Sequence, residues 1–163
     1  MKKRLNFILL NGAMASGKST IANLLQNKLD RTAILEIEDV RRLVTGADDN
    51  ALAWKVIYGM CDEYLKNGVN VLLKQTVASA DIVNKFLRLA KRHDCHILFY
   101  HFQAQRDELL KRIKQRRKNK KVPRTLIMSN IQKHEHINYR TATPINTQNM
   151  TANEVAQLIL RNL

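Results

Sequence analysis

The sequence has 163 residues, of which 45% are hydrophobic and only 5 are glycine and 2 proline. This length and composition predict one folded domain with a hydrophobic core and exclude a disordered or fibrous chain. Lys and Arg number 28 against 14 Asp and Glu, which gives a formal net charge of +14. Such a charge indicates a polyanionic partner: a nucleic acid, a nucleotide or an acidic membrane surface.

The first half of the chain alternates predicted strands with predicted helices. Residues 5–10 form a short apolar run that is typical of a buried strand, and helical spacing of apolar residues begins at Lys18. A second strand is predicted at 33–37. Apolar residues then recur every fourth position over 52–64, which predicts a helix, and a third strand follows at 69–73.

The second half continues the same alternation. Ser79 is a predicted N-cap, residues 96–102 form a fourth strand, and another helix begins near Gln105. A short strand is expected at 142–146, before a capping box that starts at Thr151. Strands that alternate with helices predict a parallel sheet with helices on both faces, joined by right-handed crossovers.

Cysteine and histidine show no pattern of a metal site or of a disulfide framework. Cys61 and Cys95 lie far apart in the sequence. His134 and His136 lie in a polar stretch, and we expect them to be solvated surface. The apolar run after the basic residues 2–4 is too short for a secretory signal, and no stretch is long enough to cross a membrane. We therefore expect a cytoplasmic protein that does not bind membranes.

One segment carries a specific chemical signal. Residues 12–19 read Gly-Ala-Met-Ala-Ser-Gly-Lys-Ser, which matches the whole P-loop pattern G-x-x-x-x-G-K-[ST]. Between a strand and a helix, such a loop wraps phosphates with backbone N–H groups, while the helix N-terminus adds positive potential. We expect Lys18 to reach the β- and γ-phosphates and Ser19 to bind Mg²⁺. The predicted nucleotide-binding residues of this segment are Gly12, Ala13, Met14, Ala15, Ser16, Gly17, Lys18, Ser19 and Thr20.

The sequence argues against a GTPase switch and against a large motor ATPase. The guanine-recognising N-K-x-D motif is missing, since Asn119 and Lys120 are followed by Lys121 and Val122, and no D-x-x-G occurs. The chain is too small for a motor. Among the classes of P-loop protein, a compact phosphotransferase that uses ATP remains.

Acidic residues follow the second predicted strand. A kinase needs a carboxylate near the attacking hydroxyl, and ligands of an open parallel sheet bind beyond the carboxyl ends of its strands. Glu36, Glu38 and Asp39 stand at that position. The alternative is that Asp39 only caps the next helix and that the other two are surface residues.

A basic segment follows the helix that begins near Gln105. Nine basic and no acidic residues occur within 111–124, and Arg112 and Arg116 lie four apart on one helix face. These arginines could fold over ATP as a lid, because a guanidinium holds phosphate at two points or stacks on adenine. The alternative is a solvated basic face or a patch that docks RNA.

Several elements spread over nearly the whole chain form one shared pattern: the loop 12–19, the segment Glu38-Asp39-Val40-Arg41, the turn Asn67-Gly68, residues 110–116 leading to 121–123, and residues 145–147 before the last helix. This pattern resembles the small P-loop kinases related to nucleoside monophosphate kinases. It is most similar to the kinase domain of polynucleotide 5′-hydroxyl kinases. The resemblance implies a three-layer αβα P-loop NTPase fold of class α/β, with a five-stranded parallel sheet, one domain over 1–163 and a short basic lid at about 112–125.

The resemblance also implies roles for individual residues. Glu38 takes the position of the catalytic aspartate, with Asp39 beside it, and Arg41, with Arg42 next to it, contacts the phosphate of the acceptor. Arg112 and Arg116 become the lid arginines, one near adenine and one near the transferring phosphoryl group.

Two departures from the family pattern concern the metal and the base. Glu38 replaces the usual aspartate, and Lys74-Gln75-Thr76 lacks the acid that many relatives use to hold hydrated magnesium. Mg²⁺ would then depend more on Ser19, the phosphates and the pair Glu38 and Asp39.

The sequence therefore predicts an enzyme that binds ATP and Mg²⁺ and transfers the γ-phosphoryl group to a hydroxyl. The expected acceptor is the 5′-hydroxyl end of RNA or DNA. One alternative is a kinase of a nucleoside, sugar, antibiotic or cell-wall precursor. Another, from a different class, is a non-catalytic ATP-binding protein that binds nucleic acid.

Overall fold

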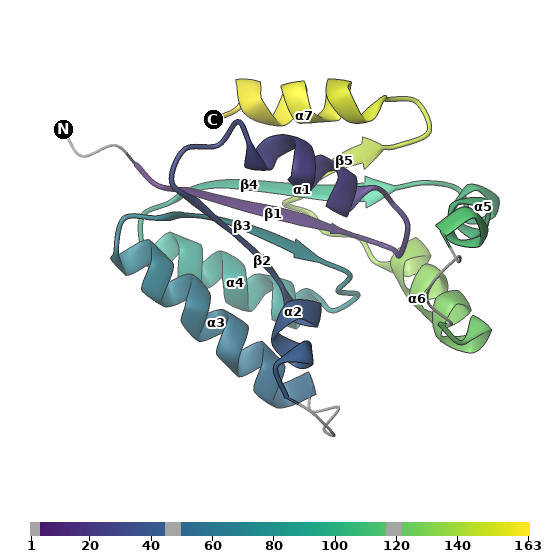
Figure 1. The fold of residues 1–163 in the computed structure, drawn as a ribbon, viewed down its shortest axis with the longest axis horizontal. Coiled ribbons are helices and arrows are strands. Elements are labelled where there is room, and N and C mark those ends of the chain that lie inside the picture. The colour runs from purple at the N-terminus through teal and green to yellow at the C-terminus, as the bar shows by residue number, and fades with distance from the viewer. Residues whose placement is uncertain (1–3, 45–49, 117–121) are drawn as a thin grey trace.

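A parallel sheet of five strands forms the middle layer of the structure, a computed structural model that describes residues 4–44, 50–116 and 122–163 (Figure 1). The strand order is β2-β3-β1-β4-β5, and every neighbouring pair runs parallel. The strands are β1 (Asn6–Gly12), β2 (Thr32–Glu36), β3 (Asn70–Gln75), β4 (His96–Gln103) and β5 (Thr143–Asn146).

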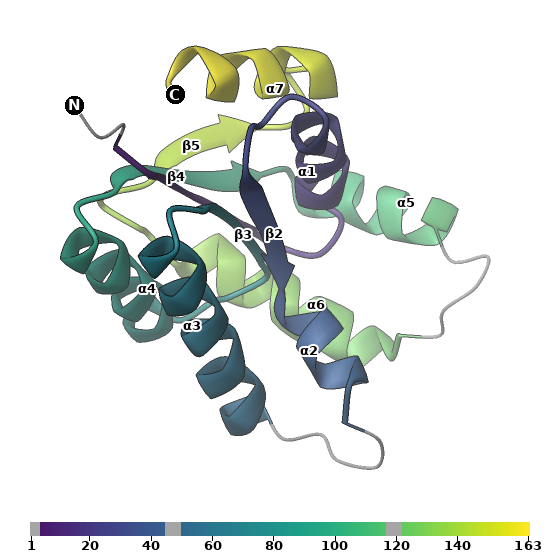
Figure 2. The same cartoon turned by 60° about the vertical axis from the view of Figure 1, so that its left-hand side comes forward.

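Helices cover both faces of this sheet and its carboxyl edge. Helices α1 (Lys18–Gln26) and α7 (Ala152–Arg161) lie on one face, and α3 (Asn50–Lys66) and α4 (Ala80–Arg92) lie on the other (Figures 1 and 2). Three helices gather near the carboxyl ends of the strands: α2 (Ile37–Arg42), α5 (Arg106–Arg116) and α6 (Arg124–His136). This arrangement confirms the predicted three-layer αβα fold. No helix in the described ranges is both long enough and apolar enough to cross a bilayer.

Strand β1 lies at the centre of the sheet and contributes to the hydrophobic core on both of its faces. All seven residues of β1 are buried, because helices cover both of its faces. Phe7 and Leu9 belong to the hydrophobic cluster under α3 and α4, whereas Ile8 and Leu10 belong to the cluster under α1 and α7. Strand β1 thus carries the chain directly from the core to its polar carboxyl end.

The local signals of the sequence correspond closely to the observed elements. Ser79 accepts a hydrogen bond from the Ile82 N–H at the start of α4, and the capping box of Thr151 and Glu154 is present at the start of α7. Helix α6 was not predicted. Its buried residues Ile127 and Ile131 give it only a narrow apolar stripe, and it follows the basic segment directly.

The sequence prediction for the histidines is wrong for His134. This residue is buried on α6, where its ring faces His101 of β4 with 5.7 Å between the ring centroids. The polar neighbours of His134 in the sequence lie on the other faces of the helix. His136 is exposed, as predicted.

Candidate active site

The loop between β1 and α1 has the shape that its glycines allow. Gly12 has φ +152°, and a Cβ atom at this position would lie 2.4 Å from the carbonyl oxygen of Phe102. Gly17 caps α1 with φ +101°. Residues that carry a Cβ atom rarely adopt these φ values, so glycine is required at both ends of the loop.

Lys18 places a positive charge inside this loop. Its side chain is buried, and Nζ donates hydrogen bonds to the carbonyl oxygens of Gly12 and Ala13, both at 2.8 Å, and to Ser16 Oγ at 3.2 Å. Ser19 follows in the first turn of α1, where it lines a cavity, whereas Thr20 is exposed. The loop therefore surrounds a fixed cation, as binding of a phosphate requires.

Two asparagines connect the loop to distant parts of the chain. Asn11 Oδ1 accepts hydrogen bonds from the N–H groups of Gly12 and Val77, both at 2.9 Å. Asn130 Oδ1 on α6 accepts from the Met14 N–H at 2.9 Å. Sequence reasoning missed Asn130, because it lies 116 positions from Met14 on a helix that was not predicted.

A cavity of about 880 Å³ opens beside the loop, within the size range of ligand sites. Residues from four parts of the fold line it: Met14, Ala15, Lys18 and Ser19 of the loop; Glu36, Ile37, Glu38, Arg41, Arg42 and Trp54 from the end of β2 through α3; Gln75 at the end of β3 and residues 76–79 after it; and Val122, Leu126, Ser129, Asn130 and Lys133 in and before α6. The cavity thus joins the phosphate loop to Glu38, Arg41 and Arg42 of α2, as predicted from their place at the sheet edge.

The two carboxylates of α2 pair with different arginines. Glu38 Oε1 lies 2.5 Å from Arg41 Nη1, and Arg41 also donates to Asn50. Asp39 Oδ1 lies 3.4 Å from Arg42 Nη1, and Asp39 is not among the residues that line the cavity. The structure therefore brings Glu38, Arg41 and Arg42 to the site and turns Asp39 toward its own helix neighbour.

The predicted lid is only partly described. Arg112 lies on α5 and is fixed by three hydrogen bonds: Nε to Glu108 Oε1 at 2.7 Å, Nη1 to Thr147 Oγ1 at 3.0 Å, and Nη2 to the Thr147 carbonyl at 2.9 Å. It does not line the cavity. Arg116 is the last residue of α5, and its side chain, like residues 117–121 of the lid, lies outside what the structure describes.

Buried polar side chains lie below the loop. Gln75 ends β3, is 3% exposed and lines the cavity, and neither its Nε2 nor its Oε1 has a hydrogen-bond partner among the described residues. Burial, followed by the charge of Lys18, lowers the pKa of His101. Burial, then Lys18 and His101, lowers the pKa of His134 to about 3. At neutral pH both imidazoles are therefore uncharged, and the positive charge that acts on them is that of Lys18.

Oxygen donors in the cavity fit Mg²⁺. The hydroxyl of Ser19, the carboxylates of Glu36 and Glu38 and the unpartnered amide of Gln75 line it together, and Mg²⁺ prefers such hard ligands. Glu36 also lies 2.7 Å from Lys74 Nζ, an ion pair that holds one of these acids at the wall. Among the described residues no cluster of three or more His, Cys, Asp or Glu side chains could hold a metal by itself, so phosphate oxygens would have to complete the site.

Comparisons with known proteins agree with this geometry. Residues 7–137 match the family described as AAA domain. No curated protein matches the sequence.

Three solved structures show the fold. A putative kinase from Chloroflexus aurantiacus is 17% identical, with a TM-score of 0.75 over 99% of this chain and 97% of its own. The Mycobacterium tuberculosis APS kinase CysC, in complex with AMPPNP and APS, is 13% identical, with a TM-score of 0.67 over 98% and 97%. A chain of the Pnkp1/Rnl/Hen1 RNA repair complex is 22% identical, with a TM-score of 0.70 over 82% of this chain and 45% of its own, so this chain spans less than half of it. At these identities the likeness establishes the P-loop NTPase fold.

Proposed function

This chain belongs to the AAA domain family, and from that premise we propose that it is an ATP-dependent kinase that phosphorylates the 5′-hydroxyl end of RNA or DNA. One observation carries the proposal. Lys18 and Ser19 of the phosphate loop line the same cavity as Glu38 and Arg41. A triphosphate and a hydroxyl acceptor could therefore meet in a single space, with a cation on one side and a carboxylate on the other.

The triphosphate of ATP binds the loop at the N-terminus of α1, where Lys18 exchanges the carbonyl oxygens of Gly12 and Ala13 for phosphate oxygens. The adenine lies against Arg112, whose guanidinium is held in one orientation by Glu108 and Thr147. A fixed guanidinium plane stacks on a base with little loss of entropy.

Glu38 is the general base. Its carboxylate takes the proton of the acceptor hydroxyl while that oxygen forms a bond to the γ-phosphorus, and the bond from the γ-phosphorus to the bridging oxygen breaks to release ADP. The ion pair with Arg41 orients the Glu38 carboxylate. Arg41 and Arg42 contact the acceptor from the α2 side of the cavity, and Arg116 and Lys18 neutralise charge on the phosphoryl group.

Ser19, Glu38 and the amide of Gln75 would hold Mg²⁺ together with the phosphates. Bound there, the ion supplies neutralisation of charge on the phosphate oxygens. The chain itself contributes to catalysis mainly by positioning, because the site keeps both reactants in one cavity.

The polynucleotide acceptor is supported by the net charge of +14 and by the likeness to a chain of an RNA repair complex. The test is transfer of labelled γ-phosphate from ATP to a 5′-hydroxyl oligonucleotide, with a 5′-phosphorylated oligonucleotide as the control. We expect label only on the first. Label on a nucleoside, sugar or antibiotic but not on the oligonucleotide would establish the small-molecule alternative. Salt-sensitive oligonucleotide binding without any transfer would establish the non-catalytic binder.

A further inference from the structure

A second hollow of about 470 Å³ lies between α6 and the segment that follows β3. Its lining residues are Ala78, Ser129, Gln132, Lys133, His136 and Ile137. Three of these, Ala78, Ser129 and Lys133, also line the cavity beside the phosphate loop. The two hollows therefore adjoin at these residues, and a ligand longer than the first could extend into the second.

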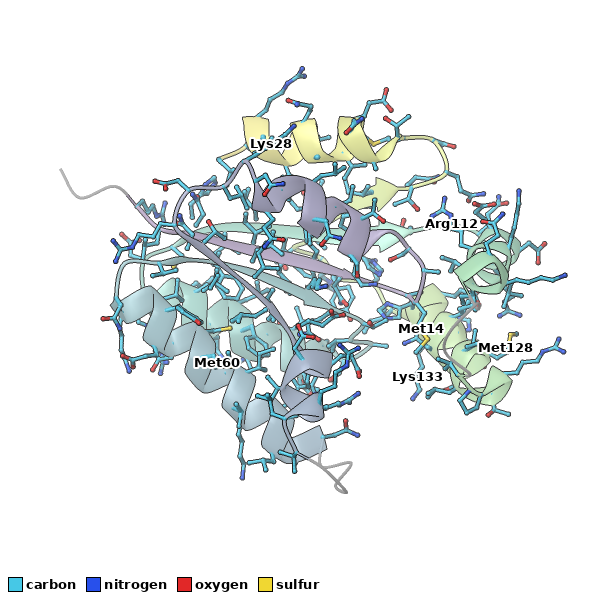
Figure 3. The ribbon with its side chains drawn as sticks, viewed as in Figure 1. Met14, Lys28, Met60, Arg112, Met128 and Lys133 are labelled. Atoms are coloured by element: carbon cyan, nitrogen blue, oxygen red, sulfur yellow. The ribbon has the colours of Figure 1, made fainter. Side chains whose placement is uncertain are left out.

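The second hollow carries positive charge at Lys133, beside the polar side chains of Ser129, Gln132 and His136. Lys133 is exposed and forms no ion pair with any described carboxylate, and Figure 3 shows it extending from α6 on the side where Met14 of the loop lies. No carboxylate of the described residues lines this hollow. The nearest acid in sequence, Glu135, is 2.6 Å from Arg106 and so is already neutralised by another residue. A phosphate group is the ligand that such a surface favours.

Helix α6 holds this surface at a fixed distance from the reaction centre. Ser129, Lys133 and His136 are spaced by four and three positions, so they share one face of the helix. The same helix is tied to the phosphate loop by the hydrogen bond from the Met14 N–H to Asn130. Its opposite side is anchored in the interior by Ile131.

We propose that this face of α6, with Lys133 at its centre, binds the phosphodiester backbone of the acceptor just 3′ of the nucleotide whose 5′-hydroxyl is phosphorylated. The inference rests on the proposed function and adds a second surface that binds the acceptor. Arg41 and Arg42 of α2 contact the acceptor from one side, and Lys133 contacts its next phosphate from the other. A nucleoside or sugar fills only the first cavity, whereas an oligonucleotide occupies both.

The test compares Lys133→Gln with Lys91→Gln, which removes the same charge from an exposed position in the last turn of α4. The acceptors are a 5′-hydroxyl decanucleotide, a nucleoside 3′-phosphate and an unphosphorylated nucleoside. We expect Lys133→Gln to raise KM for the decanucleotide about tenfold and to reduce the salt dependence of binding by about one phosphate contact. The kcat and the KM for ATP should stay within about twofold, Lys133→Arg should restore the acceptor KM, and Lys91→Gln should match the wild type.

The outcomes separate the inference from the proposed function. Equal KM values for Lys133→Gln and Lys91→Gln, or an equal effect on the unphosphorylated nucleoside, would show that α6 does not bind the backbone even though transfer proceeds. The KM for the nucleoside 3′-phosphate should rise as well, because it carries the phosphate that Lys133 contacts, and an unchanged KM for it would contradict this placement of Lys133. If the wild type transfers phosphate to no polynucleotide, the proposed function is wrong. Fluorescence anisotropy with a labelled decanucleotide then still tests the α6 face, since unchanged affinity in Lys133→Gln would overturn it.

Discussion

The two ends of the parallel sheet differ in how their polar side chains are satisfied. At the amino end the chain supplies its own partners: Arg4 pairs with Asp94 at 3.1 Å, Asn70 accepts from the Asn6 N–H at 2.8 Å, and Arg31 donates to the Asn67 carbonyl at 3.0 Å. At the carboxyl end Gln75 and His101 keep buried polar atoms without a hydrogen-bond partner in the described part of the chain.

Burying a polar group without a partner costs free energy, so folded proteins keep few of them. Their concentration at one end indicates where a ligand would complete the structure. The carboxyl end is also where all five parallel strands stop, where α1 begins and where the phosphate loop lies. The proposed chemistry therefore lies at the carboxyl end, whereas the polar side chains of the amino end pair with one another.

Replacing the buried cation of the carboxyl end should have the largest effect. Lys18→Met removes the charge that the loop encloses, and we expect kcat/KM for phosphoryl transfer to fall about a thousandfold. Steady-state kinetics measure this, with circular dichroism to show that the variant is folded. Arg31→Gln, at the amino end, is the matched control and should leave transfer within about twofold. Retention of a tenth of the activity by Lys18→Met would contradict the assignment.

Removing the proposed base tests the α2 side of the site. Glu38→Gln keeps the size of the side chain but cannot accept the proton, so kcat should fall about a hundredfold with little change in the KM for ATP. Single-turnover transfer to a 5′-hydroxyl oligonucleotide is the measurement. Asp39→Asn, measured in parallel, should have a smaller effect, because Asp39 pairs with Arg42 and does not line the cavity. A larger effect of Asp39→Asn would move the role of base to that residue.

The buried histidine predicts how stability depends on pH. Burial lowers the pKa of His134 to about 3 in the folded protein, from its ordinary value of 6.5. Between these values the unfolded chain binds a proton that the folded chain does not, so stability is constant above pH 6.5 and falls as the pH decreases. At pH 5 the loss from this residue is about 2 kcal/mol. Urea unfolding at pH 7 and pH 5 measures it, and His134→Leu should lose less on acidification. Equal losses in both proteins would rule out a buried neutral imidazole.

A substitution at Gln75 tests where Mg²⁺ binds. Gln75→Glu adds a carboxylate of the same size beside Ser19 and Glu38, and the Mg²⁺ concentration for half-maximal transfer should fall about tenfold. The increase in melting temperature caused by Mg²⁺ with a non-hydrolysable ATP analogue provides a second readout. A higher Mg²⁺ requirement would show that Gln75 does not face the metal.

The smallest effect is expected at the amino end. Arg4→Ala removes an ion pair whose side chains are 58% and 91% exposed, and solvent screens such pairs strongly. The free energy of unfolding should therefore fall by less than about 1 kcal/mol, with no change in transfer. Denaturant unfolding in low and high salt checks this, and a change in phosphoryl transfer would contradict the division of roles between the two ends.

Much of the fold and the centre of the site could be predicted from local patterns. A strand, a glycine turn and a helix are each indicated by a pattern of a few consecutive residues. The turn at 12–19 and the cap at Thr151 were therefore predicted correctly. The alternation of strands and helices then determines a parallel sheet, because only crossovers connect such strands. The acids after β2 had to lie near the loop for the same reason.

Tertiary structure alone decided which distant side chains meet. Asn130 reaches the Met14 N–H, Arg112 reaches Thr147, and His134 is buried against His101, and each of these contacts joins residues that are far apart in the sequence. A hydrogen bond or ring contact of this kind depends on how helices pack over the sheet edge. The spacing of apolar residues in the sequence does not determine that packing. The sequence therefore determined the phosphate loop and the sheet, whereas the packing of α5 and α6 determined the rest of the site.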